Sequence, residues 1–525
     1  MRIVFLALIL GLARAQFDTN AEGNRGTIVN LFSWRWTDIA KECERFLGPK
    51  GYAGVQISPP NDHSIVRAPD RPWWERYQVA GYDLVSRSGY DADDFTDMVE
   101  KCNDYDVRIY VDAVFNHMAY FGEAAISNTP FSPEDLEYPS VPYTEVDFNS
   151  HYAGLCDDPN NDLDDPSSAQ EQRNCNILAL KDLALHLPEV RGKVAAYLNK
   201  MIDIGVAGFR VDFAEHMWPE DLENIYGQLH DLKSDVFGQG VRPFIYQEVR
   251  DTGDGPIRAT EYTDLGRVTE FNYGPLIANA IRRVTPLANL RDQLGSSSQL
   301  LPSDKSLIFI DSHYTQRADE WKDKVLTFDE GRNYRLGTTF MLAWPYSVTR
   351  VMSSYRFNDY DDGPPSNSYG DILSPQIGSN EMCSGQYVCE HRWRAIKNMV
   401  AFQNAVRGES ITNWWDNGNQ QVAFGRGNKG FVVINNELNQ DLTETLQTGL
   451  PKAEYCNVIL GDIERGQCSG PTVDVRSDGT ADFVIGSSGD SMVVIYVDAI
   501  VTDGGSATNI SLIVLVLAFF VSLII

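Results

Sequence analysis

The stretch Gly208-Phe-Arg-Val-Asp212 is a short apolar run that ends in a carboxylate. The runs Val107-Arg-Ile-Tyr-Val-Asp112 and Phe244-Ile-Tyr-Gln-Glu248 have the same form. A fourth run, Leu307-Ile-Phe-Ile-Asp311, also ends in an aspartate. Because short runs rich in β-branched and aromatic residues predict buried strands, we expect acidic groups at the carboxyl ends of several strands.

Eight such runs alternate with helical stretches, at residues 27–32, 54–57, 107–112, 208–212, 244–248, 268–272, 307–311 and 339–343. Strands that alternate with helices favour a parallel sheet over a sandwich, and eight of them predict an α/β fold, a (β/α)8 TIM barrel. The carboxyl ends of barrel strands surround one mouth. We therefore expect Asp112, Asp212 and Glu248 to converge there.

Asp212 and Glu248 are the predicted catalytic pair. Retaining glycosidases use two carboxyl groups about 5–5.5 Å apart, one of which attacks carbon while the other protonates the leaving oxygen. Taken alone, the two residues fit a structural or metal-bound pair equally well.

Four segments at these strand ends resemble, in order, the four signature segments of animal α-amylases, members of glycoside hydrolase family 13: Asp112-Ala-Val-Phe-Asn-His-Met118, Gly208-Phe-Arg-Val-Asp-Phe-Ala-Glu-His-Met-Trp218, Phe244-Ile-Tyr-Gln-Glu-Val249 and Phe309-Ile-Asp-Ser-His313. Four further segments carry the same resemblance: Phe32-Ser-Trp-Arg-Trp36, Gly54-Val-Gln-Ile-Ser-Pro-Pro60, Arg71-Pro-Trp-Trp-Glu-Arg-Tyr-Gln78 and Arg350-Val-Met-Ser-Ser-Tyr-Arg356. The resemblance covers nearly all of residues 16–497. It implies a calcium-dependent endo-hydrolase of α-1,4-glucans in starch- or glycogen-like polysaccharides.

The resemblance implies roles for the acidic pair and its neighbours. Asp212 would be the nucleophile, Glu248 the general acid/base, and Arg210 would hold the nucleophile as a carboxylate. We expect Arg210 to lower the pKa of Asp212 and a drier pocket to raise that of Glu248. The implied substrate-binding residues are Trp73, Trp74, Tyr77, Gln78, Asp112, His117, Arg210, Glu215, His216 and His313.

Trp73 and Trp74 would belong to a platform for the non-reducing side of the glucan, on which sugar faces stack. The alternative for two adjacent tryptophans is core packing. The charged neighbours Arg71, Glu75 and Arg76 argue against a wholly buried position.

Two ions are implied by the same resemblance. Calcium would bind Asn116, Asp182 and the backbone carbonyls of Arg173 and His216, and would join an inserted segment to the barrel. Chloride would bind Arg210 and Arg350, but Ser312 replaces the asparagine of the family's anion site. One of three chloride ligands is thus shortened, and chloride dependence stays open.

The sequence departs from the family where the third acidic residue belongs, because position 314 is a tyrosine. Glu215 replaces a lysine that contacts the reducing-side sugar, and Ala318-Asp-Glu-Trp-Lys-Asp-Lys324 replaces a glycine-rich loop. Losing one preorganised electrostatic group costs about 10²–10³ in rate. Tyr314 therefore leaves two hypotheses: a weakened hydrolase, which we prefer, and a surface glucan-binding or receptor protein without effective turnover.

The predicted domains are a barrel at residues 16–117 and 181–415, an inserted calcium-binding domain at 118–180, and a C-terminal antiparallel β-sandwich at 416–500. Eight cysteines in an exported chain predict four disulfides. The expected pairs are Cys43–Cys102, Cys156–Cys175, Cys383–Cys389 and Cys456–Cys468.

Both ends of the chain carry targeting signals. Residues 1–15 have the charge, apolar core and Ala13-Arg14-Ala15 site of a signal peptide. Residues 504–525 combine small residues with an apolar tail, as in a GPI signal, although the short spacer leaves a tail anchor open. We expect the protein on the extracellular face of the cell membrane, with secretion as the alternative.

The formal net charge of −29 excludes nucleic acid and anionic lipid surfaces as partners, because both are polyanions. A neutral α-glucan is indifferent to this charge. We expect a monomer.

Overall fold

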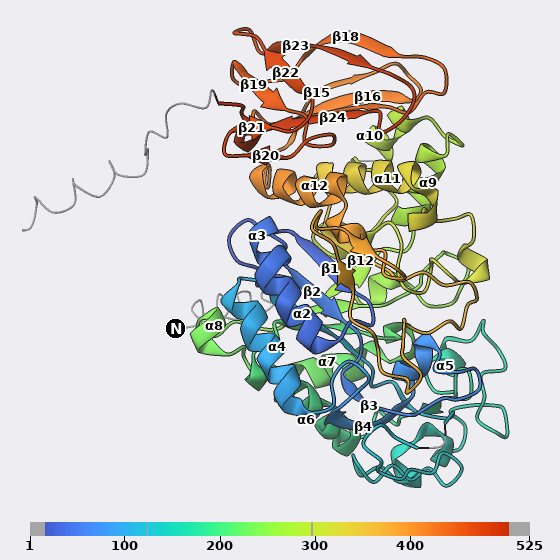
Figure 1. Cartoon of the computed structure of the whole chain (residues 1–525). Coiled ribbons are helices and arrows are strands. Elements are labelled where there is room, and N and C mark those ends of the chain that lie inside the picture. The colour runs from blue at the N-terminus through green and yellow to red at the C-terminus, as the bar shows by residue number, and fades with distance from the viewer. Residues whose placement is uncertain (1–15, 123, 296–297, 503–525) are drawn as a thin grey trace, which may run out of the picture.

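The computed structural model describes residues 16–122, 124–295 and 298–502 (Figure 1). The predicted signal peptide at 1–15 and the predicted anchor at 504–525 lie outside the described residues. Within those ranges, no helix is both long enough and apolar enough to cross a membrane.

Eight parallel strands close into the predicted barrel in the order β1-β12-β11-β10-β9-β8-β5-β2. Their bounds are β1 (Thr27–Leu31), β2 (Gly54–Ile57), β5 (Arg108–Ala113), β8 (Gly208–Val211), β9 (Phe244–Gln247), β10 (Arg267–Thr269), β11 (Ser306–Phe309) and β12 (Val348–Ser353). Nearly every residue of these strands is buried, as expected where helices cover the outside of a parallel barrel. The predicted α/β barrel is confirmed.

The eighth strand was predicted in the wrong place. Residues 339–343 belong to helix α11 (Arg332–Ala343), and the strand that closes the barrel is β12, which follows it. Every residue of α11 from Leu336 to Ala343 is buried, so the helix has no polar face along this stretch. A short continuous apolar run fits a buried helix as well as a buried strand.

The larger helices around the barrel are α2 (Trp36–Glu42), α4 (Ala92–Asp104), α6 (Pro188–Ile204), α7 (Pro219–Gly227), α9 (Tyr273–Ile281), α11 and α12 (Arg394–Ala405). Shorter ones are α3 (Gly48–Lys50), α8 (Ser234–Phe237) and α10 (Leu290–Gln293). Helix ends follow local signals: Asp91 caps α4 by accepting from the Asp94 N–H at 2.9 Å, Pro188 begins α6, and Gly205 ends it at φ 126°. These stops keep each helix between two strands.

The segment between β5 and β8 leaves the barrel and returns to it beside its point of departure. Strands β6 (His117–Met118) and β7 (Lys181–Asp182) pair antiparallel, with His117 opposite Asp182. The segment between them holds the short helix α5 (Ala169–Gln172). A nearby hairpin pairs β3 (Asn61–His63) with β4 (Val79–Leu84). The β6–β7 pair thus brings residues far apart in sequence to one edge of the barrel mouth.

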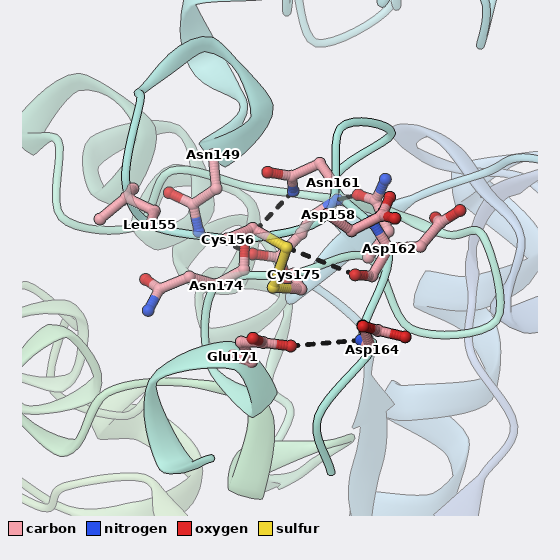
Figure 2. The surroundings of a disulfide bond; sticks show 12 residues. Asn149, Leu155, Cys156, Asp158, Asn161, Asp162, Asp164, Glu171, Asn174 and Cys175 are labelled. Atoms are coloured by element: carbon pink, nitrogen blue, oxygen red, sulfur yellow. Dashed lines mark hydrogen bonds between the residues drawn. A yellow bond between two sulfur atoms is a disulfide. The ribbon is translucent and has the colours of Figure 1, made fainter.

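Little regular structure stabilises this inserted segment, and the Cys156–Cys175 disulfide crosses it (Figure 2). Around the disulfide, the Asn161 side chain donates to the Asn174 carbonyl at 3.3 Å, and Glu171 accepts from the Asp164 N–H at 3.2 Å. The other disulfides are Cys43–Cys102, Cys383–Cys389 and Cys456–Cys468, so all four expected pairs form.

The C-terminal domain is antiparallel, as expected, and lies beyond α11 and α12 at the top of Figure 1. One sheet contains β15 (Ile411–Asp416), β16 (Gln421–Arg426), β17 (Gly430–Asn435) and β24 (Met492–Tyr496). The paired strands β18 (Leu442–Gln447) with β23 (Thr480–Ile485), and β19 (Ala453–Cys456) with β22 (Thr472–Val475), contribute to the same buried core. Minor ladders join β13 (Gln376–Ile377) to β14 (Cys383–Ser384) and β20 (Ile463–Glu464) to β21 (Gln467–Cys468). The first strand, β15, begins five residues before the predicted boundary at 416.

Candidate active site

A cavity of about 740 Å³ opens at the carboxyl ends of the barrel strands. Its walls are Trp73, Trp74, Tyr77, Gln78, His117, Phe121, Ile177, Leu178, Ala179, Leu180, Arg210, Asp212, Phe213, Glu248, Arg250, His313, Tyr314 and Tyr360. Most of the predicted substrate-binding residues are therefore brought together. Asp112, Glu215 and His216 do not line this cavity. Asp311 turns away from it to accept from the Tyr334 hydroxyl at 3.0 Å.

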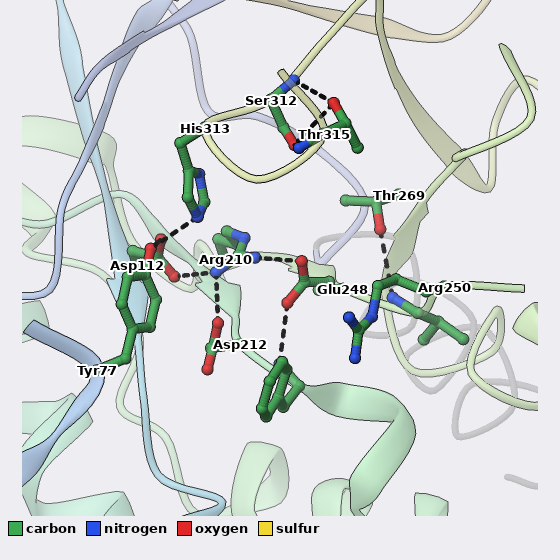
Figure 3. Close-up of polar contacts among 12 residues, drawn as sticks. Tyr77, Asp112, Arg210, Asp212, Glu248, Arg250, Thr269, Ser312, His313 and Thr315 are labelled. Atoms are coloured by element: carbon green, nitrogen blue, oxygen red, sulfur yellow. Dashed lines mark hydrogen bonds and ion pairs between the residues drawn. The ribbon is translucent and has the colours of Figure 1, made fainter. Parts of the chain in front are cut away.

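Arg210 connects three carboxylates, two of which, Asp212 and Glu248, line the cavity (Figure 3). Its Nη1 donates to Asp112 and, at 2.8 Å, to Asp212, while Nη2 lies 2.6 Å from Oε1 of Glu248. Arg210 and Asp212 are two positions apart at the end of β8, so they point to the same side. The strand register places Asp112 directly opposite Arg210. The predicted catalytic pair is thus held by one buried guanidinium.

A chain of hydrogen bonds leads from Asp112 toward the aromatic wall. The Tyr77 hydroxyl donates to Oδ2 of Asp112 at 2.9 Å and lies 3.0 Å from Nε2 of His313. Because the hydroxyl has one proton and gives it to Asp112, His313 donates from Nε2. Burial lowers the pKa of His313 well below its usual value, so this histidine is neutral. This chain of hydrogen bonds orients Asp112 without adding a positive charge.

Glu248 receives hydrogen bonds at both of its carboxylate oxygens. Oε1 faces Arg210, and Oε2 accepts from the Phe213 N–H at 3.2 Å. Phe213 directly follows Asp212 and has φ 50°, in the left-handed region. That conformation costs a non-glycine residue about 1–2 kcal/mol. The turn after β8 therefore carries strain while it directs a backbone donor at the acid/base candidate.

The pKa shifts run opposite to the prediction. Burial raises the pKa of Asp212 well above its usual value despite Arg210, with Glu248 and Asp112 adding repulsion. Burial also acts to raise the pKa of Glu248, but Arg210, Arg250 and the Phe213 N–H outweigh it and hold that pKa low. The prediction failed because Arg210 is shared by three carboxylates, and Glu248, unlike Asp212, also has Arg250 nearby to stabilise its charge.

The aromatic wall lies where the platform was expected. Trp73 is 6% exposed and contacts Tyr77 and His313 edge to face, at 5.8 and 5.4 Å between ring centroids. Trp74 is more accessible, packs against Phe121, and donates from Nε1 to Asp361 at 2.7 Å. Phe121 and Tyr360, which also line the cavity, were not predicted from the sequence, since aromatic residues on long loops carry no local signal.

The charged neighbours of the two tryptophans do not keep them exposed. Glu75 is wholly buried, and it accepts from Arg71 and Arg87 at 2.8 Å each. Arg76 is also buried, with Nη2 donating to Ser88 at 2.6 Å. The argument from local charge failed because charges that find partners inside the fold can be buried.

The remaining predicted sugar ligands are already bonded within the protein. Gln78 accepts from the N–H groups of Tyr120 and Phe121 at 3.0 Å each. Nε2 of His117 lies 3.0 Å from the Tyr77 carbonyl, and Nδ1 of His216 lies 2.8 Å from the Gln172 carbonyl. Burial lowers the pKa of both histidines to about 4. Both are therefore neutral donors at physiological pH.

The predicted calcium ligands meet beside the β6–β7 pair. Asn116, Arg173 and His216 line a cavity of about 10 Å³, and Asp182 accepts from Asn116 at 3.2 Å and from Asn149 at 2.6 Å. Burial raises the pKa of Asp182 well above its usual value, and Oδ1 of Asn149 is buried without a partner. Among the described residues, no cluster of three His, Cys, Asp or Glu side chains could hold a metal. The site instead offers amide, carbonyl and carboxylate oxygens, the donors that suit calcium.

The predicted chloride ligands are close but engaged elsewhere. Nη1 of Arg350 donates to Gln56 at 2.9 Å, and burial, together with Arg210, lowers the pKa of Arg350. The Ser312 hydroxyl accepts from the Thr315 N–H at 3.1 Å. Both arginines are thus bonded to other groups of the barrel, and the serine shapes its own turn.

Position 314 belongs to a group of charged and aromatic side chains that the sequence did not predict as a unit. The Tyr314 hydroxyl donates to Glu320. The Arg250 guanidinium lies 5.4 Å from the Tyr314 ring centroid and donates from Nε to Glu215 at 2.7 Å. Arg250 stands two residues after Glu248, at the end of a barrel strand. That position is the sequence signal from which Arg250 could have been predicted to lie in the site.

Comparison with known proteins agrees with this geometry. Family models of the α-amylase catalytic domain and of the α-amylase C-terminal all-β domain match residues 55–236 and 412–498. Pancreatic α-amylase 2a5 of Mus musculus is 47% identical, and pancreatic α-amylase of Homo sapiens 45%, each over 95% of this chain and 100% of the relative.

Solved structures give the same result. α-Amylase I of Eisenia fetida superposes with a TM-score of 0.86 at 42% identity, over 91% of this chain and 98% of that one. A glutamine-for-glutamate mutant of that protein in complex with maltohexaose gives a TM-score of 0.85. Identity at this level along the whole fold shows that the chain belongs to the animal-type α-amylase family.

Proposed function

We propose that the protein hydrolyses α-1,4-glucosidic bonds of starch- or glycogen-like polysaccharides by a retaining mechanism, at a rate reduced by Tyr314. The observation that carries the proposal is the bridge that Arg210 forms between Asp212 and Glu248 on the cavity floor. Two carboxylates bound to one guanidinium are held close together, as a double displacement requires.

In this mechanism Asp212 attacks the anomeric carbon in its ionised form, which requires that the proton favoured on Asp212 by burial lies on Glu248 instead. Arg210 donates a hydrogen bond to Oδ1 of Asp212 and so orients the carboxylate. No described residue donates to Oδ2, and this oxygen is therefore free to attack. Glu248 protonates the oxygen of the leaving sugar, and a glycosyl group becomes bonded to Asp212. Glu248, now ionised, removes a proton from water, which releases the sugar and restores both carboxyl groups. The donors around Glu248 favour this second, basic role.

Asn116, Asp182 and the carbonyls of Arg173 and His216 would hold calcium, with Asn149 as an additional oxygen donor. When bound, the ion would compensate the buried charge of Asp182 and fasten the inserted segment to the barrel. Chloride would sit near Arg210 and Arg350.

The second candidate is a glucan-binding or receptor protein without effective turnover. The observation that favours it is Tyr314, whose hydroxyl is bonded to Glu320 instead of supplying a carboxylate to the cavity. Binding would still use the aromatic wall.

Hydrolysis of maltoheptaose by the purified protein in calcium-containing buffer separates the two candidates, with Glu248→Gln as the control. General acid/base catalysis contributes about 10²–10⁴ in rate, so the unmodified protein should exceed the control by that factor. Equal rates, with both proteins binding maltoheptaose, would reject hydrolysis and support the binding function.

We propose that the protein acts as a monomer at the outer cell surface, attached through residues 504–525, or is secreted. Release from cells by a phosphatidylinositol-specific phospholipase would support a lipid anchor. Protein found in the medium without the phospholipase would support secretion instead.

A further inference from the structure

One side of the cavity is lined by Arg250, Phe213 and Tyr314. Glu215 binds Arg250 and Glu320 binds Tyr314, and we call these five residues the Arg250 cluster. In Figure 3, Arg250 and Glu248 lie on one side of Arg210, while Tyr77, Asp112 and His313 lie on the other. Arg250 thus lies across Arg210 from Tyr77, a residue beside the aromatic wall.

The Arg250 guanidinium is held in a fixed position. Nε donates to Oε1 of Glu215 at 2.7 Å, and the guanidinium carbon lies 5.1 Å from the Phe213 ring centroid and 5.4 Å from that of Tyr314. Two rings and one ion pair restrict the rotation of a side chain that is otherwise flexible.

The terminal nitrogens of Arg250 are free to act on a ligand. Arg250 lines the cavity and its side chain is 26% exposed. Its only protein hydrogen bond among the described residues uses Nε, which leaves Nη1 and Nη2 without protein acceptors. Two parallel N–H donors in one plane match two neighbouring oxygen atoms.

The position of Arg250 relative to Glu248 determines which sugar it meets. Glu248 protonates the oxygen of the leaving group, so the leaving sugar lies on the Glu248 side of the bond that breaks. Arg250 stands two residues beyond Glu248, and its charge reaches that carboxylate. The aromatic wall, with Tyr77, serves the opposite side.

Resting on the proposed function for the identity of the ligand, we infer that Arg250 determines specificity by donating hydrogen bonds from Nη1 and Nη2 to adjacent hydroxyls of the leaving-side sugar. The charge of Arg250 is already balanced by Glu215, and Glu248 and Glu320 add negative charge nearby. The cluster therefore suits a neutral glucose unit and disfavours a phosphorylated one.

The test compares a substrate that has a sugar on the leaving side with one that does not. Maltoheptaose places sugars on both sides of the bond, whereas α-maltosyl fluoride has no sugar on the leaving side. Hydrogen bonds from a charged donor contribute about 1.5–3 kcal/mol, so Arg250→Met should reduce kcat/KM for maltoheptaose by about 10-fold to 10²-fold. Cleavage of α-maltosyl fluoride, measured at the pH optimum of each protein, should fall far less, and Arg250→Lys should be intermediate for maltoheptaose.

The matched control is Arg258→Met. Arg258 is 47% exposed, pairs with Asp251 at 3.3 Å and lies outside the cavity, so this variant should cleave both substrates normally. An equal loss on both substrates in Arg250→Met would overturn the inference, because Arg250 would then act through the carboxylates. Unchanged cleavage of maltoheptaose would overturn it as well.

Binding measurements separate this inference from the proposed function. Calorimetry in the Glu248→Gln background compares maltoheptaose affinity with and without Arg250→Met, and the inference expects a weaker affinity in the double variant. If the unmodified protein cleaves neither substrate, the proposed hydrolysis fails, while the affinity difference still decides the role of Arg250. Equal affinities in that case would reject the inference too.

Discussion

The two sides of the cavity are built differently. On the platform side, Tyr77, Asp112 and His313 form a closed hydrogen-bond chain that ends on Arg210, and each belongs to a segment that matches the family. On the other side, Arg250 and Tyr314 follow barrel strands as loop residues and form contacts that the family motifs do not predict. Residues after the strand ends lie on loops, which can differ while the barrel register stays the same, so the two sides of one cavity can be built differently.

The largest expected effect on activity is on the side of the cavity that contains Tyr314. In Tyr314→Asp, a carboxylate would replace the phenol that now bonds Glu320, beside the cavity floor. Since one preorganised electrostatic group is worth about 10²–10³ in rate, kcat/KM for maltoheptaose should rise by about 10². Tyr314→Phe, which removes only the hydroxyl, is the control and should not rise. No gain in the aspartate variant would mean that the loop around position 314 already supplies a substitute for the missing carboxylate.

Calcium removal should weaken the platform side, because the insert contributes Leu178 and Leu180 to the cavity wall. A ligand present at about 100 times its Kd stabilises the fold by about 2.7 kcal/mol, so a chelator should lower the free energy of unfolding by about that amount. Asp182→Asn should show the lower stability without the chelator. Asp157→Asn, at an exposed position of the insert, should respond like the unmodified protein. Thermal unfolding with and without a chelator measures this.

Trp74→Ala tests the platform alone. Trp74 is the more accessible of the paired tryptophans, and its loss leaves Asp361 without its 2.7 Å donor. Stacking on an aromatic ring contributes about 0.5–1.5 kcal/mol, so KM for maltoheptaose should rise by up to about tenfold while kcat changes little. Tyr369→Ala removes a ring that is 88% exposed and outside the cavity, and it should leave KM unchanged. A fall in kcat alone would count against a platform role.

The smallest expected change is in pH dependence. Arg250 is one of the groups that hold the pKa of Glu248 low, together with Arg210 and the Phe213 N–H. The general acid must be protonated, so activity falls as the pH rises through the pKa of Glu248. Removing Arg250 raises that pKa, and the basic limb of the kcat/KM profile of Arg250→Met should move to higher pH. A shift to lower pH would show that Arg250 does not act on Glu248.

Much of the fold was predictable because its pattern is local. Seven barrel strands were found from short β-favouring runs, and several ended in the acidic residues that meet Arg210. The eighth was misplaced into α11, since a helix buried on all sides has no polar face to reveal its period. The burial of Glu75 was also missed, because its partners Arg71 and Arg87 become neighbours only in the folded chain.

The sequence by itself determined the barrel and the family, and it predicted the acidic pair and the departure at Tyr314, because each depends on residue identity at a strand end. Only the tertiary structure decided how the charges are shared. Arg210 serves three carboxylates, and Arg250 reaches Glu248 and Glu215 from a neighbouring loop. Electrostatic interactions depend on distance and burial, which the order of residues along a chain does not specify.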